Sequence, residues 1–143
     1  MEETSFEEKR KDLEGHIVGY MNFKWKLYSR NYWLNCFLVV FAILTSVSVT
    51  LVGLLGLEKY SPYIGIVLTV TISMQTAFNF SERADFYLNI HTQAKSLRDR
   101  IKFNVKTEKE LENVVDILSQ LRMKASSEIP KGKGMKVVSD SNA

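Results

Sequence analysis

Two long uncharged stretches dominate the hydrophobic pattern of this chain. They cover residues 31–57 and 60–81, and only Glu58 and Lys59 separate them. An α-helix needs roughly 20 mainly apolar residues to cross the ~30 Å hydrocarbon core of a bilayer, and it satisfies its own backbone hydrogen bonds there. Because so short a separation allows only a tight turn, the pattern predicts a transmembrane helical hairpin with both termini on one side of the membrane.

An amphipathic helix is predicted before the hairpin. Ser5 and Glu8 form a capping box, which places the start of the helix near Phe6. Apolar side chains then recur at helical spacings and define one stripe, which consists of Phe6, Leu13, Ile17, Tyr20, Met21 and Tyr28. No proline separates this helix from the first span, so it either continues into the span or bends near residues 29–31.

Further helical patterns follow the second span. The first is a heptad-like seam without a helix breaker before it, formed by Tyr87, Ile90, Ala94, Leu97 and Ile101. We therefore expect the second span to continue as a helix beyond the membrane. A second capping box, Thr107 with Glu110, begins a last helix. The seam of this helix consists of Leu111, Val114, Leu118 and Leu121, and Pro130 ends the structured part.

These patterns predict an all-α membrane protein with a single domain at residues 1–130 and a homo-oligomeric bundle as its assembly. The predicted elements are a cytoplasmic helix at 6–30, spans at 32–57 and 60–81, a cytoplasmic extension at 82–103 and a C-terminal helix at 107–127. The small, polar tail at 131–143 is expected to be disordered.

The positions of the charges predict the orientation better than the net charge of +3 does. The loop between the spans carries one Lys beside one Glu, whereas both flanks are rich in basic residues. These are Lys24, Lys26 and Arg30 before the first span and Arg83, Lys95, Arg98, Arg100 and Lys102 after the second. The positive-inside rule therefore places both termini in the cytoplasm.

A polar stripe on the second span is the main candidate site. It consists of Thr69, Ser73, Thr76 and Asn79. Such a stripe is costly against lipid, so we expect it to face another helix or water. Two interpretations remain open, namely a pore lining in a ring of several copies and dry helix packing. Three charged residues would stand at the cytoplasmic mouth of a pore, and these are Glu82, Arg83 and Asp85.

Small residues form a second stripe, on the first span. Ala42, Ser46, Thr50 and Gly53 recur at spacings of three or four, which lets helix backbones approach closely in lipid. Packing between the two spans is the simplest explanation. Asn35 lies near the same face and is expected to form a hydrogen bond between helices.

Catalytic and metal chemistry find little support in this sequence. His16 and His91 are isolated, Cys36 is the single cysteine, and no catalytic triad or phosphate-binding loop is recognisable. We therefore expect neither an enzyme nor a metal, cofactor or nucleic-acid site. A juxtamembrane basic cluster could contact anionic lipid or a phosphorylated ligand, although its charges spread around the helix: Lys95, Arg98, Arg100 and Lys102.

Three stretches together resemble the SLATT family, two-transmembrane effector domains associated with bacterial nucleotide signalling and defence. They are KWKLYSRNYW at residues 24–33, FNFSERADFYLNIHTQAKSLRDRI at 78–101 and ASSEIP at 125–130. The very short loop between the spans agrees with them. The resemblance covers nearly the whole chain, from about Lys11 to Pro130.

The resemblance implies an oligomeric pore that breaches the bacterial inner membrane and kills or arrests an infected cell. It also implies, as partners, a nucleotide second messenger or a nucleotide-synthesising or reverse-transcriptase protein, and it supplies no catalytic residues. The leading prediction is thus a homo-oligomeric, pore-forming effector that contacts membrane lipid. The alternative is a non-conducting membrane anchor or adaptor that recruits a cytoplasmic partner through its helical seams.

Overall fold

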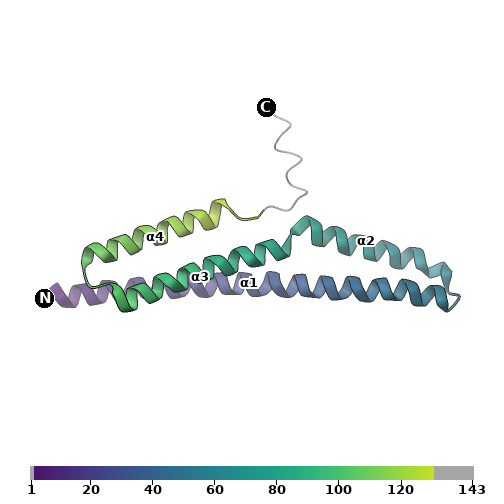
Figure 1. Ribbon diagram of the computed structural model, residues 1–143, viewed down its shortest axis with the longest axis horizontal. Coiled ribbons are helices and arrows are strands. Elements are labelled where there is room, and N and C mark those ends of the chain that lie inside the picture. The colour runs from purple at the N-terminus through teal and green to yellow at the C-terminus, as the bar shows by residue number, and fades with distance from the viewer. Residues whose placement is uncertain (1, 131–143) are drawn as a thin grey trace, which may run out of the picture. The chain divides into compact units, whose positions relative to one another are not determined.

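The computed structural model describes residues 2–130, with side chains from Ser5 onward, and its regular elements in that range are all helical. In chain order they are α1 (Glu2–Leu54), the 3-10 helix η1 (Glu58–Tyr60), α2 (Ser61–Phe78), α3 (Phe80–Asn104) and α4 (Glu108–Ser127) (Figure 1). The all-α prediction is confirmed for this part of the chain. The predicted tail at 131–143 lies outside the described residues.

Helix α1 runs through residues 29–31 without a break, so the first of the two alternatives is correct. It begins at Glu2 and not near Phe6, which places Ser5 inside the helix and makes the predicted capping box wrong. It also ends at Leu54, earlier than the predicted end of the first span at residue 57.

A glycine turn explains why α1 ends before the uncharged stretch does. Gly56 has a φ of +68°, a left-handed conformation that glycine adopts without steric cost. The amide of Leu57 donates to the carbonyl oxygen of Val52 at 3.0 Å, and that of Gly56 donates to Gly53 at 3.2 Å. This pair of bonds is the Schellman motif, which satisfies the last carbonyls of a helix. Pro62 then lies in the first turn of α2.

The expected continuous helix from the second span into the cytoplasm is wrong, because Asn79 interrupts it. Asn79 has φ 48° and ψ 48°, and its amide caps α2 by donating to the carbonyl oxygen of Gln75 at 3.2 Å. Asparagine adopts this left-handed conformation more readily than most residues. The second span therefore ends at Phe78, and the 18 residues of α2 rise about 27 Å, close to the thickness of a hydrocarbon core.

The described residues divide into two compact units. Residues 2–29 and 84–129 form the first, which we call the three-helix unit, and residues 30–83 with Pro130 form the second, the hairpin unit. In the three-helix unit α1, α3 and α4 share one core, and its most deeply buried side chains are Ile17, Ile90, Ile101 and Val114. The seams predicted on α3 and α4 are confirmed, because each of their members is buried.

Polar contacts tie the three helices of this unit together. Lys9 on α1 pairs with Glu108 on α4 at 2.6 Å. His91 on α3 donates from Nδ1 to the carbonyl oxygen of Met21 on α1 at 3.0 Å, which requires the neutral imidazole to carry its proton on Nδ1. The ring of His91 also lies 5.1 Å from that of Trp25. His91 is therefore packed against α1.

Two helical segments, Ser5–Leu54 and Glu58–Asn104, are each long and apolar enough to cross a membrane. The hairpin unit contains the apolar part of both segments. In the most apolar 18-residue stretch of each segment, only 11% of the residues (first segment) and 6% (second segment) are buried inside the described part of the chain. The core helix of a soluble protein would bury most of such a stretch, so this exposure favours membrane insertion or extensive packing against other chains.

Candidate functional site

The polar residues predicted on the second span lie on the outer surface of the hairpin. Thr69, Ser73 and Thr76 are all exposed, and none of them lies in the contact with α1. Asn79 is half-buried, but it ends α2 through its backbone. The structure therefore leaves three of the four candidates on one continuous helix face and assigns a capping role to the fourth.

Two of these hydroxyls already have a partner within α2. Thr69 donates to the carbonyl oxygen of Gly65 at 2.9 Å, and Thr76 donates to that of Ile72 at 3.0 Å. Such back-bonding satisfies the hydroxyl proton and leaves the oxygen free as an acceptor. The expectation that this stripe is too costly to face lipid is weakened accordingly, since only the acceptor side of each hydroxyl needs a partner.

The small residues of α1 lie beside the contact between the spans and not inside it. Ala42 is half-buried there, whereas Ser46, Thr50 and Gly53 are exposed. The hairpin segment of α1 instead carries a heptad seam of buried or half-buried residues, which consists of Asn31, Asn35, Leu38, Ala42, Thr45, Val49 and Val52. Packing between the two spans therefore explains the small side chain at Ala42, but not the small residues at the other three predicted positions.

One groove along the hairpin brings the two stripes to the same side. Ala42 and Ser46 of α1 line it together with Leu68 and Ile72 of α2. Residues three and four apart share a helix face, so Thr69 and Thr76 lie on the side of Ile72, and Thr50 lies on the side of Ser46. We call this surface the hydroxyl flank, and its members are Ser46, Thr50, Gly53, Thr69, Ser73 and Thr76.

The opposite side of the hairpin has a different character. A second groove there is lined mainly by bulky apolar side chains, among them Phe41, Leu44, Tyr63 and Val67. Its aliphatic hydroxyls are Ser48, which donates to the carbonyl oxygen of Leu44 at 2.8 Å, and the buried Thr45. The hairpin thus presents a small, hydroxyl-bearing flank and a bulky flank, and no other part of residues 5–130 covers either one.

Asn35 forms the bond between spans that the sequence predicts. The amide nitrogen of Gln75 on α2 donates to Oδ1 of Asn35 at 3.4 Å. This is a long hydrogen bond, but both groups are partly buried in a segment of apolar neighbours.

The predicted cytoplasmic mouth is only partly available for ions. Glu82 and Asp85 are exposed, whereas Arg83 is half-buried and donates from Nε to the carbonyl oxygen of Pro130 at 3.1 Å. Arg83 therefore has a structural role at the base of the hairpin.

The residues of the predicted basic cluster have separate surroundings. Arg98 pairs with its neighbour Asp99 at 2.7 Å, and Lys102 lies over the ring of Phe103 at 5.7 Å. Lys95 and Arg100 are exposed, so the four charges do not share one partner.

Histidine and acidic side chains do not gather into a metal site within residues 5–130. His16 lies 3.6 Å from Asp12 on the exposed face of α1, a spacing of one helical turn.

Sequence reasoning missed a cluster of cations around one aromatic ring in the three-helix unit. The ammonium of Lys24 lies 5.1 Å from the centre of the Tyr20 ring, and the guanidinium of Arg122 lies 5.6 Å from it. Lys24 also lies over the rings of Phe23 at 5.7 Å and Tyr87 at 5.5 Å. The residue as a whole is 8% exposed, but the buried polar side-chain atom that lacks a hydrogen-bond partner among the described residues is the hydroxyl oxygen of Tyr20.

The environment of Lys24 disfavours its charge. Burial lowers the pKa of Lys24, and it raises the pKa of Tyr20, which nearby Arg122 partly opposes. A cation–π contact contributes about 0.5–2 kcal/mol, so the neighbouring rings oppose part of this effect on the charge of Lys24. The position of Lys24 in the sequence could have indicated that it lies against the core, because it continues the stripe of Ile17 and Met21 at helical spacing.

No protein-family model matches this chain, and no curated protein and no solved structure matches it either. The arguments for function therefore come from the geometry described above, and the resemblance to the SLATT family remains a hypothesis.

Proposed function

We propose that the chain is the subunit of a homo-oligomeric membrane pore, in which the hydroxyl flank faces neighbouring copies and a conducting path. The observation that carries this proposal is the collection of hydroxyl and small residues from both spans on one exposed side of the hairpin. A lone hairpin leaves this side unpaired in lipid, whereas a ring of copies would cover it or hydrate it.

Physical chemistry limits the kind of pore that these residues could form. Residues 31–57 and 60–81 carry no charged side chain, so hydroxyl oxygens and apolar groups would line the path. Because Thr69 and Thr76 donate their protons to their own helix, they would present acceptor oxygens to passing ions. We infer weak selectivity for cations over anions and a gate formed by an apolar constriction.

The cellular setting is part of the same proposal. The distribution of basic residues supports a cytoplasmic position for both termini, and the resemblance to the SLATT family supports the bacterial inner membrane and a role as a defence effector. The trigger would be a nucleotide second messenger, or a partner protein that makes nucleotides or is a reverse transcriptase.

Conductance of the purified protein in planar bilayers tests the proposal. Thr76→Leu is expected to reduce the single-channel conductance several-fold, because it removes an acceptor and narrows the path. Ser48→Leu is the matched control: it also removes a back-bonded hydroxyl, but from the opposite flank. Equal effects of the two substitutions, or no conductance from the wild type, would contradict the assignment of the hydroxyl flank.

A non-conducting membrane adaptor is the second candidate function. It is favoured by a groove of about 330 Å³ between α3 and α4, in which apolar side chains are bordered by polar ones. Leu97, Ile117 and Leu121 provide the apolar surface, which suits the apolar stripe of a partner helix. In this case the hydroxyl flank would pack dry against a second hairpin.

The mass of the particle in nanodiscs distinguishes the two functions. Four or more copies would place at least eight spans together and would support an enclosed path. A monomer or dimer that shows no conductance would favour the adaptor, because four spans enclose little space.

A further inference from the structure

The hydrogen bond between Arg83 and Pro130 brings a distant part of the chain to the base of the hairpin unit. Arg83 is half-buried, and its Nε donates to the carbonyl oxygen of Pro130 at 3.1 Å, although 47 positions separate the two residues. Both residues belong to the hairpin unit. The sequence that follows Pro130 therefore starts beside the first turn of α3.

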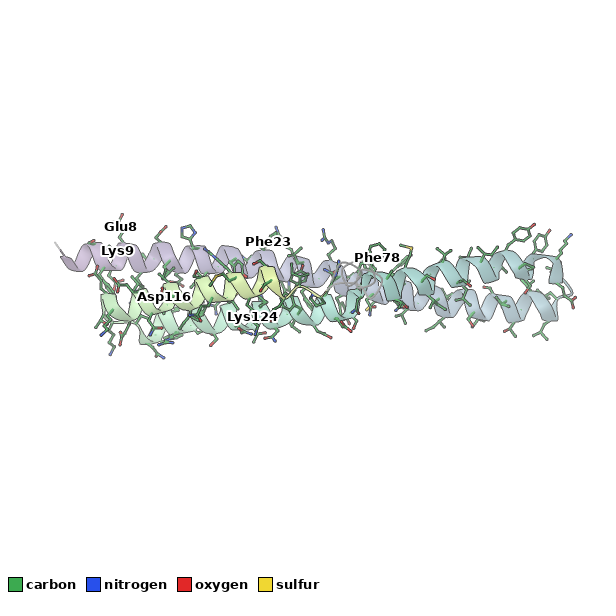
Figure 2. The ribbon with its side chains drawn as sticks, turned by 90° about the horizontal axis from the view of Figure 1, so that it is seen from above. Glu8, Lys9, Phe23, Phe78, Asp116 and Lys124 are labelled. Carbon is green, nitrogen blue, oxygen red and sulfur yellow. The ribbon has the colours of Figure 1, made fainter. Side chains whose placement is uncertain are left out.

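In a bilayer, the membrane boundary of the hairpin would lie close to this bond. The uncharged helix α2 ends at Phe78, which Figure 2 labels. The contact between Asn35 and Gln75 aligns the two antiparallel spans (Figure 1). About one turn closer to the base, Tyr32 and Phe78 therefore lie roughly level with each other. Tyr32 and its neighbour Trp33 are both exposed, as in the aromatic belt at a membrane surface.

The depth of Pro130 follows from the rise of the helix. Arg83 lies about 7 Å beyond Phe78, since a helix rises 1.5 Å per residue. The headgroup layer on each side of a bilayer is about 5–7 Å thick. The bond to Arg83 therefore holds Pro130 within or beside the headgroup layer of a membrane that the hairpin crosses.

The eight residues after Pro130 have the composition of a segment that binds an anionic lipid surface. Residues 131–138 read KGKGMKVV, with three lysines and no acidic residue, and we call them the basic segment. Methionine and valine are apolar groups that can enter the headgroup boundary beside the charges. Each lysine is within six residues of Pro130, which is about 20 Å of extended chain, so all three can reach the same surface.

We propose that the basic segment binds the surface of an anionic lipid bilayer next to the hairpin. Because Pro130 presents the segment at the headgroup layer, its lysines meet the headgroups at a high effective concentration. A nucleic acid also carries negative charge, but a bilayer that the hairpin crosses is the anionic partner beside Pro130 in every copy. The proposal rests on insertion of the hairpin into a membrane, which is one part of the proposed function, and not on conductance.

The test uses the full-length protein in nanodiscs of two lipid compositions. An environment-sensitive fluorophore is attached through Ser139→Cys in a Cys36→Ser background, directly after the basic segment. When phosphatidylglycerol replaces part of the phosphatidylcholine, its emission should shift to the blue, because the bilayer removes water from the dye. Equal emission in the two lipids would overturn the proposal.

The same dye attached through Ser5→Cys, in the first turn of α1, is the control for partition of the dye itself. Its emission should be that of a hydrated dye in both lipids. An equal blue shift from both positions would contradict binding by the basic segment.

Charge substitutions and salt locate the binding. Each lysine near an anionic surface contributes roughly fivefold to binding, so a triple glutamine variant should lower the ratio of bound to free segment roughly 100-fold. This variant combines Lys131→Gln, Lys133→Gln and Lys136→Gln. The matched control removes the same charge from three exposed lysines and combines Lys102→Gln, Lys106→Gln and Lys109→Gln. Equal losses in the two triple variants would reduce the effect to overall charge and would overturn the proposal.

Salt provides an independent check on the wild type. Raising the ionic strength from 0.1 M to 1 M shortens the screening length from about 10 Å to about 3 Å, so the segment should be released. A blue shift that survives 1 M salt would contradict an electrostatic contact with lipid.

Alkaline carbonate extraction of membranes separates failure of this proposal from failure of the proposed function. A chain that carbonate extracts is not inserted, and both proposals are then wrong. A chain that resists extraction but does not respond to phosphatidylglycerol overturns the role of the basic segment alone. If a single-stranded oligonucleotide shifts the emission in phosphatidylcholine nanodiscs and phosphatidylglycerol does not, the partner is a nucleic acid and the lipid proposal is wrong.

Discussion

The side-chain amide of Gln75 on α2 donates to Oδ1 of Asn35 on α1, and this 3.4 Å contact joins the two spans of the hairpin. The two residues are separated by 40 positions in the sequence. Their contact sets which turns of the two helices face each other, because both side chains are short and partly buried. It is the natural place to test whether the hairpin is held by polar or by apolar packing.

We predict that Asn35→Leu and Gln75→Leu are each mildly destabilising and that their effects are not additive. Polar contacts between transmembrane helices contribute about 0.6 kcal/mol on average, and the length of this bond places it at or below that value. A double-mutant cycle on unfolding in detergent micelles measures the coupling. A coupling of zero would mean that the 3.4 Å contact contributes nothing to the stability of the hairpin.

Asn79 is predicted to act through its backbone. Asn79→Gly should be tolerated, because glycine adopts the left-handed conformation freely, whereas Asn79→Ala should cost about 1 kcal/mol. Unfolding in micelles measures the cost. If the side-chain amide lined a path instead, both variants would change conductance equally, so bilayer recordings on the pair distinguish the two roles.

The core of the three-helix unit is predicted to be sensitive to truncation. Ile90 is 1% exposed and packs in the shared core, so Ile90→Ala should lower the free energy of unfolding by about 2–5 kcal/mol. Val115, on the outer face of α4, is 47% exposed, and Val115→Ala should cost less than about 0.5 kcal/mol. Fluorescence of Trp25, whose ring lies 5.1 Å from that of His91 in this unit, reports the transition. Similar losses in the two variants would argue against this core.

The second capping box is confirmed and makes a specific prediction. The amide of Glu110 donates to Oγ1 of Thr107 at 3.3 Å, and the amide of Thr107 donates to Oε2 of Glu110 at 3.1 Å. Thr107→Ala should therefore destabilise the protein by about 1 kcal/mol, while Thr107→Ser should keep the cap. Chemical unfolding of the two variants provides the comparison, and an equally large loss in Thr107→Ser would exclude capping as the cause.

The same box predicts a dependence on pH. Hydrogen bonds from the amides of Lys106 and Thr107 hold the pKa of Glu110 below its usual value of 4.5. The unfolded chain therefore takes up this proton at a higher pH than the folded chain does. The contribution of Glu110 is present above about pH 4.5 and is lost as the pH falls through the lower pKa of the folded state. Unfolding measured from neutral to acidic pH should show a shallower loss in Glu110→Gln than in the wild type.

Much of the three-helix unit follows from its sequence. The seams on α3 and α4 have helical spacing, and their members are buried as predicted. The cap at Thr107 could also be predicted from the sequence, because the two residues that form it are only three positions apart. The cap predicted at Ser5 is wrong, since α1 begins at Glu2 and continues past it. The break at Asn79 was missed as well, because asparagine is compatible with both a helix and its left-handed end.

The sequence by itself determined that the chain contains two apolar helices joined by a tight turn, since length and absence of charge are properties of each segment alone. Only the tertiary structure decided which face of each helix meets another. It brought Ser46 of α1 and Ile72 of α2 to the same groove of the hairpin, and it placed the ammonium of Lys24 beside three aromatic rings. Helical periodicity defines faces within one helix, whereas the rotation of one helix against another depends on how their side chains pack.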